Sequence, residues 1–337
     1  MKKTSIYINR MLVFFGVSNW PVLYDTKGVK MLNFKNVLRF FPMNICSEMD
    51  RCFGTKEMGE INSLEEIRIR VGKPILLKLG EKEEMLNHVV TSEEILEILQ
   101  HLCDNSIYSY QSQICNGFLT VQGGHRIGIT GNVVIKENKV TNISYVSSLN
   151  IRIAKQIVGC SNKILKYVLD VEHNSVLNTL IVSSPGGGKT TLLRDLIRKI
   201  SSGMEQIKFH GINVGVIDER GEIAAMYKGV PQNDIGIRTD VLDNIPKALG
   251  MKMMIRSMSP HVIVADEIGS REDVEAIEEA IHCGIRGIFT AHGSGIEDLK
   301  ANPALRNLMD TNVFKRIIFL ENKEVKGVWG MCEKDAC

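Results

Sequence analysis

The chain has 337 residues, of which 44% are hydrophobic and 24% charged, and its formal net charge is +2. This length favours two domains, and the near-neutral charge excludes a global attraction to nucleic acid or anionic lipid. The eight cysteines are scattered, without a C-x-x-C pair or metal-ligand spacing to histidine, which indicates reduced thiols and argues against a zinc site. No run approaches the roughly 18 apolar residues that would span a membrane, so we expect a cytoplasmic protein.

The first part of the chain predicts a small mixed α/β domain over 31–155, preceded by a disordered extension over 1–30. Alternation over 66–71 predicts a half-buried strand with Ile67, Ile69 and Val71 on its buried face. Ser92 is the predicted cap of a helix, and a glycine-rich β region covers 117–150. The residues predicted to point inward from that helix are Ile95, Leu96, Leu99 and Leu102.

The second part, over 156–337, shows strands alternating with helices, which is the pattern of a parallel sheet covered on both faces. The fold class is therefore α/β. The predicted strands cover 179–183, 214–218, 261–266, 287–292 and 313–320. The predicted helices cover 191–200, 246–258 and 270–283, and Ser270 is the predicted N-cap of the last one.

A phosphate-binding loop is the most specific motif. It reads Ser183-Ser184-Pro185-Gly186-Gly187-Gly188-Lys189-Thr190-Thr191, between an apolar strand and a helix. The glycines let backbone N–H groups surround the phosphates, Lys189 reaches the β- and γ-phosphates, and the Thr190 hydroxyl can bind Mg²⁺. We predict that residues 184–191 bind ATP. Ser183 replaces the usual first glycine, for which we expect a modest cost.

An acidic pair follows the apolar run over 262–265. Asp266 and Glu267 would stand at the carboxyl end of a buried strand, where ligands of open α/β sheets gather. We predict that Asp266 holds Mg²⁺ through water and that Glu267 orients or deprotonates the attacking water. Alone, such a pair would more often be a solvated strand end. Its position about 80 residues after the phosphate-binding loop favours the catalytic interpretation.

Two further strand ends are ambiguous from the residues alone. Asp218-Glu219-Arg220-Gly221-Glu222 reads equally as a surface turn or as part of a site. His292 closes the strand over 287–292, where it could sense the γ-phosphate or serve only the structure.

With these pieces in order, the chain resembles the stage III sporulation protein AA family, mother-cell ATPases related to the motors of type II and type IV secretion and of pilus retraction. The resemblance runs from about residue 64 to about residue 298. Serine at 183 and glycine at 221 depart from the family's pattern. The stretches that carry it are 64–70, Gly123-Gly124-His125-Arg126, 216–220, 236–243, 255–260 and Thr290-Ala291-His292-Gly293.

The resemblance implies a RecA-like core joined to a smaller N-terminal domain, working as a hexameric ring with ATP between subunits. It implies docking at a membrane complex, a channel between mother cell and forespore. By the same resemblance, Glu219 belongs to an acidic box near the catalytic water and His292 to a histidine box. Arginines of the N-terminal domain complete such sites, and Arg126 and Arg152 are the candidates by position; ordinary surface arginines are the alternative.

Other functions remain open at this stage. RecA-like folds also drive nucleic-acid translocases and helicases, although the sequence has no RNA-binding motif and only 6% aromatic residues. We expect no specific nucleic-acid partner. A third possibility is a scaffold that binds ATP without hydrolysing it, against which the Asp266–Glu267 pair argues.

Overall fold

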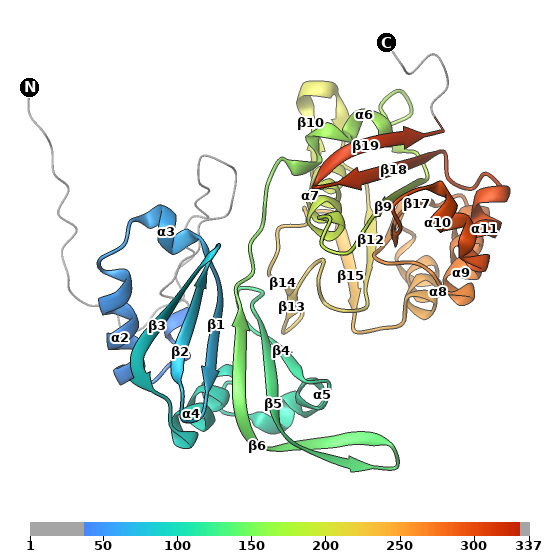
Figure 1. Cartoon of the computed structure of the whole chain (residues 1–337). Helices are drawn as coiled ribbons and strands as arrows, with labels where there is room; N and C mark the ends of the chain where they lie inside the picture. Colours follow the sequence, from blue (N-terminus) through green and yellow to red (C-terminus); the bar gives the residue numbers. More distant parts are fainter. Residues whose placement is uncertain (1–36, 331–337) are drawn as a thin grey trace, which may run out of the picture.

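The computed structural model of the chain describes residues 37–330, which form an N-terminal and a C-terminal sheet with their helices (Figure 1). The predicted extension over 1–30 lies outside the described residues. Between residues 37 and 330, no helix has both the length and the apolar composition needed to cross a membrane. We propose residue 155 as the boundary between the two domains; it follows the last strand of the N-terminal sheet.

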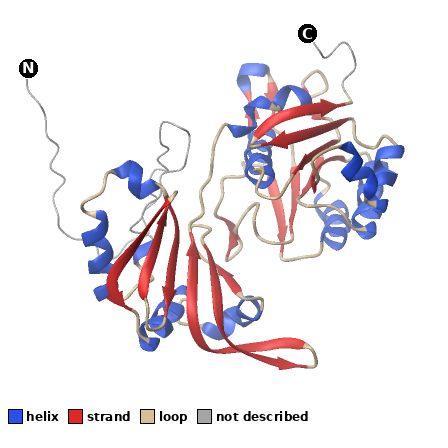
Figure 2. Cartoon of the chain, in the orientation of Figure 1, coloured by secondary structure: helices blue, strands red, loops and turns tan. Residues whose placement is uncertain are grey.

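The N-terminal sheet has six antiparallel strands. One face packs on helices α2 (Met43–Phe53), α4 (Ser92–Leu102) and α5 (Gln111–Cys115) (Figure 2). The shorter helices are α3 (Met58–Asn62) and η1 (Ile107–Tyr110), and η1 adds Tyr110 to the core. The strands run in the order β3 (Lys82–Val89), β2 (Pro74–Leu79), β1 (Leu64–Arg70), β6 (Lys139–Arg152), β5 (Arg126–Lys136) and β4 (Phe118–Thr120).

Alternation places the apolar side chains of this sheet under the helices, as predicted for Ile67 and Ile69, which are fully buried. Two inward predictions were wrong. Val71 is 37% exposed because β1 ends at Arg70 and the chain turns there. Leu96 is 50% exposed because α4 buries only the stripe formed by Ile95, Ile98, Leu99 and Leu102.

The helix cap differs by one residue from the prediction. Thr91, and not Ser92, precedes α4, and its hydroxyl accepts from the amide of Glu94 at 3.2 Å while the Glu94 carboxylate accepts from the amide of Thr91 at 2.8 Å. This reciprocal pair is a capping box. Both residues suit the capping position, so the residue that caps is decided by the glutamate three residues further on.

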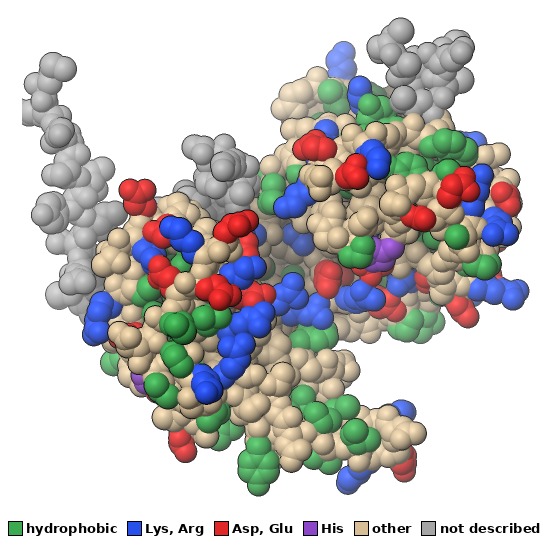
Figure 3. Space-filling model, viewed as in Figure 1, with side chains coloured by type: hydrophobic (Ala, Val, Ile, Leu, Met, Phe, Trp, Pro, Cys, Tyr) green, Lys and Arg blue, Asp and Glu red, His purple; other side chains and the backbone are tan. Residues whose placement is uncertain are grey.

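Strands β5 and β6 continue past the sheet as a long hairpin that extends away from the body of the domain (Figure 1). Its outer half carries exposed apolar side chains, among them Ile135 at 63% and Tyr145 at 87% exposure. Hydrophobic side chains form patches along this arm in the space-filling view (Figure 3).

The C-terminal sheet has seven strands, all parallel except the last. The predicted strands are present, but the edge strand β15 and the final β19 were missed. The order is β15 (Thr239–Asp243), β12 (Val214–Asp218), β16 (Val262–Ala265), β17 (Arg286–His292), β9 (Thr179–Ser183), β18 (Arg316–Glu321) and β19 (Glu324–Trp329).

Alternate residues of each buried strand enter two separate cores. Ile181 of β9 points to the core under helix α7 (Lys189–Ser202), while Leu180 and Val182 point to the core under α8 (Lys247–Met258) and α9 (Arg271–His282). Helices α10 (Ile296–Ala301) and α11 (Pro303–Asp310) belong to the same helical layer as α8 and α9. This is the three-layer RecA-like arrangement expected, and the predicted cap of α9 is confirmed by a capping box between Ser270 and Asp273.

Short elements surround this core. The chain enters the C-terminal domain through η2 (Cys160–Lys163) and α6 (Leu165–Val168). The small elements that follow are β7 (Leu169–Asp170), β8 (Ser175–Val176), β10 (Gly203–Met204), η3 (Glu205–Ile207), β11 (Phe209–His210), β13 (Met226–Tyr227) and β14 (Val230–Pro231).

The two domains meet along the segment over 222–234. The amide of Gly123 donates to the side-chain oxygen of Gln232 at 2.8 Å. The hydroxyl of Tyr227 donates to Asp104 at 2.5 Å. Gly124, with a φ of +76°, lies so close that a Cβ added to it would stand 3.2 Å from Ala225 Cβ. Glycine at 124 thus allows the backbones of the two domains to approach closely.

Candidate active site

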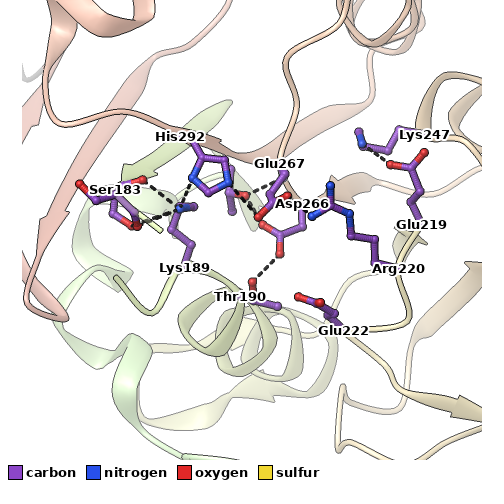
Figure 4. Close-up of polar contacts among 12 residues, drawn as sticks. Ser183, Lys189, Thr190, Glu219, Arg220, Glu222, Lys247, Asp266, Glu267 and His292 are labelled. Atoms are coloured by element: carbon purple, nitrogen blue, oxygen red, sulfur yellow. Dashed lines mark hydrogen bonds and ion pairs between the residues drawn. The ribbon is translucent and has the colours of Figure 1, made fainter. Parts of the chain in front are cut away.

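Four adjacent strands, β9, β17, β16 and β12, end at the same edge of the C-terminal sheet. Because parallel strands bring their carboxyl ends together, polar residues far apart in the sequence gather there. Figure 4 shows them facing one another at this edge. The P-loop follows β9, His292 ends β17, Asp266 and Glu267 follow β16, and Asp218 ends β12.

The P-loop is shaped by its glycines. Gly186 and Gly188 have φ angles of +74° and +88°, which glycine adopts without strain. A Cβ on Gly187 would come within 2.4 Å of Ser183 Oγ, so no other residue fits there without a shift. Gly188 is followed at once by α7, whose amino-terminal N–H groups and helix dipole attract anions. Residues 184–191 thus form the loop and first turn predicted to hold the phosphates.

Lys189 points back toward the end of β9. Its ammonium donates to the carbonyl oxygen of Ser183 at 2.9 Å and contacts the hydroxyl of Ser183 at 3.3 Å. Burial lowers the pKa of Lys189, while the charges of Asp266 and Glu267 oppose that effect. Serine in place of glycine at 183 therefore adds a polar contact to the lysine, which the sequence alone did not indicate.

Asp266 is held by two threonine hydroxyls. Thr190 Oγ1 donates to Asp266 Oδ2 at 2.5 Å, and the hydroxyl of Thr290 on β17 donates to Oδ1. The residues predicted to bind Mg²⁺ are thus in direct contact. Their oxygen atoms are the ligand type that Mg²⁺ prefers, and it commonly keeps several waters beside one or two protein ligands.

Glu267 lies between two partners. Its Oε1 accepts from His292 Nε2 at 2.9 Å, and its Oε2 accepts from the Arg220 guanidinium at 2.6 Å. His292 Nδ1 lies 3.3 Å from Lys189 Nζ, which can only donate, so we assign the His292 proton to Nε2. The backbone of Glu267 has a φ of +54°, an unusual value for this residue type that is common at functional sites.

The acidic group after β12 has two roles. Asp218 is buried and accepts hydrogen bonds from the amides of residues 222–224 at 2.8 to 3.0 Å. Burial raises the pKa of Asp218, and these amide contacts only partly oppose that effect. It closes the turn that presents its neighbours to the site. Glu219 forms an ion pair with Lys247 of α8.

The two candidate arginines of the N-terminal domain lie in paired positions of neighbouring strands, Arg126 on β5 and Arg152 on β6. Arg126 pairs with Glu222 at 2.8 Å across the domain boundary and lies 3.9 Å from the centre of the Phe118 ring. The side chain of Arg152 is 62% exposed, and its carboxylate contact is Glu66 at 3.9 Å. Among the contacts that residues 37–330 make, neither arginine touches the P-loop of its own chain.

Sequence reasoning missed three residues that contact the acidic groups, namely Arg220, Lys247 and Thr290. Arg220 was part of a recognised stretch but received no role. Thr290 stands two residues before His292, and this spacing places both side chains on one face of β17. That spacing was a usable signal. Lys247 offered none, because it belongs to no recognised motif.

A seven-stranded, mostly parallel sheet with this loop, lysine and acidic pair defines a P-loop NTPase with a RecA-like fold. The family model described as "Sporulation stage III, protein AA" matches residues 43–335 of the chain. Stage III sporulation protein AA of Bacillus subtilis is 42% identical over 264 residues, which are 78% of this chain and 84% of that protein. The chain therefore belongs to the stage III sporulation protein AA family.

Two solved structures share the fold. The Legionella pneumophila ATPase DotB superimposes with a TM-score of 0.52 at 16% identity, over 80% of this chain and 75% of that one. The pilus retraction motor PilT with bound ADP gives 0.51 at 15% identity, over 77% and 75%. These similarities agree with the predicted RecA-like core and smaller N-terminal domain.

Proposed function

We propose that the chain is an ATPase that hydrolyses ATP at the edge formed by the P-loop, Asp266 and Glu267. One observation carries this proposal: within residues 37–330, neither the buried Lys189 nor the half-buried Asp266 forms an ion pair, whereas Glu267 pairs with Arg220 and Glu219 pairs with Lys247. A buried charge without a counter-charge is costly. A phosphate for Lys189 and a metal ion for the Thr190–Asp266 pair would supply the missing charges.

Each residue of the site has a separate role in this proposed hydrolysis. Lys189 and the amides of residues 186–191 would hold the β- and γ-phosphates, and Thr190 with Asp266 would hold Mg²⁺, directly or through water. When bound, Mg²⁺ neutralises phosphate charge. Water oxygen bonds to the γ-phosphorus as the bond to the bridging oxygen breaks and its electron pair leaves with ADP. Glu267 accepts the proton of that water, and His292 orients the carboxylate by donating to Oε1.

We propose further that the protein works as a homo-oligomer, a hexameric ring, and that it drives a membrane channel between mother cell and forespore. The support is family membership together with a fold shared with ATPase DotB and the retraction motor PilT. Arg152, which is largely exposed, is in this proposal the arginine offered to a neighbouring subunit. Arg126 would first have to leave Glu222.

Phosphate release by the purified full chain with Mg·ATP tests the enzyme, with Lys189→Ala as the inactive variant. A chain that binds ATP but releases no phosphate at any concentration would be a scaffold and not a motor. Stimulation by DNA or RNA in low salt would instead favour a nucleic-acid translocase. Membrane proteins recovered with a Glu267→Gln variant from sporulating cells would identify the complex that it drives.

A further inference from the structure

Arg220 is placed at the site by the turn that Asp218 closes. The turn projects Arg220 toward the end of β16, where its guanidinium donates to Glu267 Oε2 at 2.6 Å (Figure 4). Arg220 also lines, with Asp218, Glu219, Asp266 and Glu267, a small polar cleft at this edge. Arg220 is therefore a second cation at the site besides Lys189, and it contacts the predicted base directly.

This cation occupies the opposite side of the acidic pair from the lysine. Lys189 contacts Nδ1 of His292, the other imidazole nitrogen contacts Glu267, and Arg220 contacts the far oxygen of Glu267. The contacts form a continuous chain from the P-loop to Arg220. A γ-phosphoryl group held by Lys189 would extend toward Glu267, because the attacking water must lie between that carboxylate and the phosphorus.

The pair between Arg220 and Glu267 can be exchanged at little cost. The Arg220 side chain is 63% exposed and that of Glu267 26% exposed, and ion pairs in such surroundings contribute little. A γ-phosphoryl group carries more negative charge than a carboxylate, and a guanidinium can bind two of its oxygens at once. In contrast, Lys247 is only 12% exposed and stays paired with Glu219, so Arg220 is the cation that can move.

We propose that Arg220 is a catalytic residue supplied by the same chain, a cation that leaves Glu267 when ATP binds and donates to the oxygens of the γ-phosphoryl group. This inference rests on the proposed ATPase function. The exchange has two effects at once: Glu267 becomes free to take the proton of the attacking water, and the charge that develops on the γ-phosphoryl oxygens is stabilised. Arg220 keeps its own protons throughout.

The test compares Arg220→Ala and Arg220→Lys with Arg271→Ala, a control in which an arginine 87% exposed on α9 and paired with Glu275 is removed. Affinities for ATP and for ADP are measured with Mg²⁺ by calorimetry, and kcat is measured at a concentration where all variants have the same mass by light scattering. Glu267→Gln and the double variant Arg220→Ala, Glu267→Gln complete the set.

We expect Arg220→Ala to lower kcat by about a hundredfold or more and to weaken ATP binding while leaving ADP affinity within about twofold. Lysine should restore part of the rate, and the double variant should be slower than Glu267→Gln alone. Equal losses of ATP and ADP affinity, or none, would overturn the proposal. The two affinities test Arg220 by binding alone, so they remain decisive even if the wild-type chain releases no phosphate and the ATPase proposal fails.

Discussion

Asp195, on the P-loop helix, and Ser161, at the entry to the C-terminal domain, are joined by two hydrogen bonds. One Asp195 oxygen accepts from the amide of Ser161 at 2.9 Å and from its hydroxyl at 2.6 Å, and the other accepts from Arg198 at 2.8 Å. The Asp195 side chain is fully buried. The helix that carries Lys189 and Thr190 is therefore fixed to the segment that links the two domains.

This pair predicts a pH-dependent stability. Burial opposes ionisation of Asp195, but the contacts with Ser161 and Arg198 outweigh it and hold its pKa below the ordinary value. The folded state thus favours the charged form, and this contribution is present above the unfolded pKa of about 3.9 and lost as pH falls through the folded value. Asp195→Asn should lower the free energy of unfolding by about 1–3 kcal/mol at pH 7.

Urea denaturation from pH 7 down to about pH 3.5 would measure this effect. The difference between wild type and Asp195→Asn should narrow below about pH 4. Glu275→Gln, at an exposed position of α9, is the matched control and should differ little from wild type. A difference that stayed constant with pH would mean that the charge of Asp195 does not contribute.

Lys189→Met should abolish ATP binding and hydrolysis while leaving the fold as stable as wild type or more so. Burial lowers the pKa of Lys189, so its positive charge destabilises the folded state at every pH below the folded pKa. Methionine keeps the aliphatic stem without that cost. Thermal unfolding without nucleotide checks the stability, and calorimetry checks the binding. A melting temperature well below that of wild type would show that the lysine is needed by the fold.

Glu267→Gln should retain ATP affinity within a few-fold while kcat falls by about a hundredfold or more. Glutamine keeps one acceptor oxygen, which can bind His292 or Arg220 but not both, and it cannot accept a proton, while the P-loop is unchanged. His292→Ala should have a smaller effect, since it removes the group that orients Glu267 and not the base itself. Single-turnover phosphate release would measure both. A wild-type rate for Glu267→Gln would refute its assignment as the base.

The sequence predicted the sheet because apolar runs and turn residues are local signals, and β9, β12, β16 and β17 were each found. It missed the edge strand β15, Thr239–Asp243, because every residue of that strand is half-buried. Its sequence therefore has neither the continuous apolar run of a buried strand nor the alternation of a strand with one buried face. Val71 and Leu96 were misplaced for a related reason. An apolar residue at the right period still becomes exposed when the strand ends or when the neighbouring layer does not extend over it.

At the site, the motif residues were predictable, but their pairing was not. Lys189 and Thr190 follow from the P-loop pattern, whereas the contact of Arg220 with Glu267 joins residues 47 positions apart. That contact depends on β12 lying beside β16 and on Asp218 closing its turn. Both are tertiary facts that the pattern Asp-Glu-Arg does not contain. The resemblance pointed to Arg126 and Arg152 of the N-terminal domain as the arginines of the site, whereas the structure supplies a candidate, Arg220, in the same domain as the P-loop.

Deleting residues 1–30 should leave the melting temperature and the ATP affinity unchanged. Among the described residues the N-terminal core starts at Val37, which is fully buried, and the P-loop and the acidic pair lie in the C-terminal domain. Differential scanning fluorimetry and calorimetry on the truncated and full chains would decide. A fall of several degrees on truncation would show that the extension packs against the core, and the proposed domain limits would then have to move.

The rate of hydrolysis per subunit should rise steeply with protein concentration as a ring forms. Among residues 37–330 Arg220 is the arginine in contact with Glu267, while Arg152 of the N-terminal domain is 62% exposed and has Glu66 as its carboxylate contact. An arginine inserted from a neighbour is typically worth about 10³ to 10⁵ in rate. Arg152→Ala should therefore reduce kcat in the assembled protein without changing ATP affinity in the isolated subunit.

Mixing two inactive variants distinguishes a role of Arg152 in a neighbour's active site from a structural role. Arg152→Ala subunits and Lys189→Ala subunits are each expected to be nearly inactive, but a mixed ring contains some interfaces that join an intact P-loop to an intact arginine. The mixture should recover activity above the sum of its parts. Arg51→Ala, which removes a 79% exposed arginine from α2, is the control and should leave the rate unchanged. If a demonstrated monomer turned over at the full rate and Arg152→Ala matched wild type, hydrolysis would be complete within one chain, and the ring would serve only to transmit force.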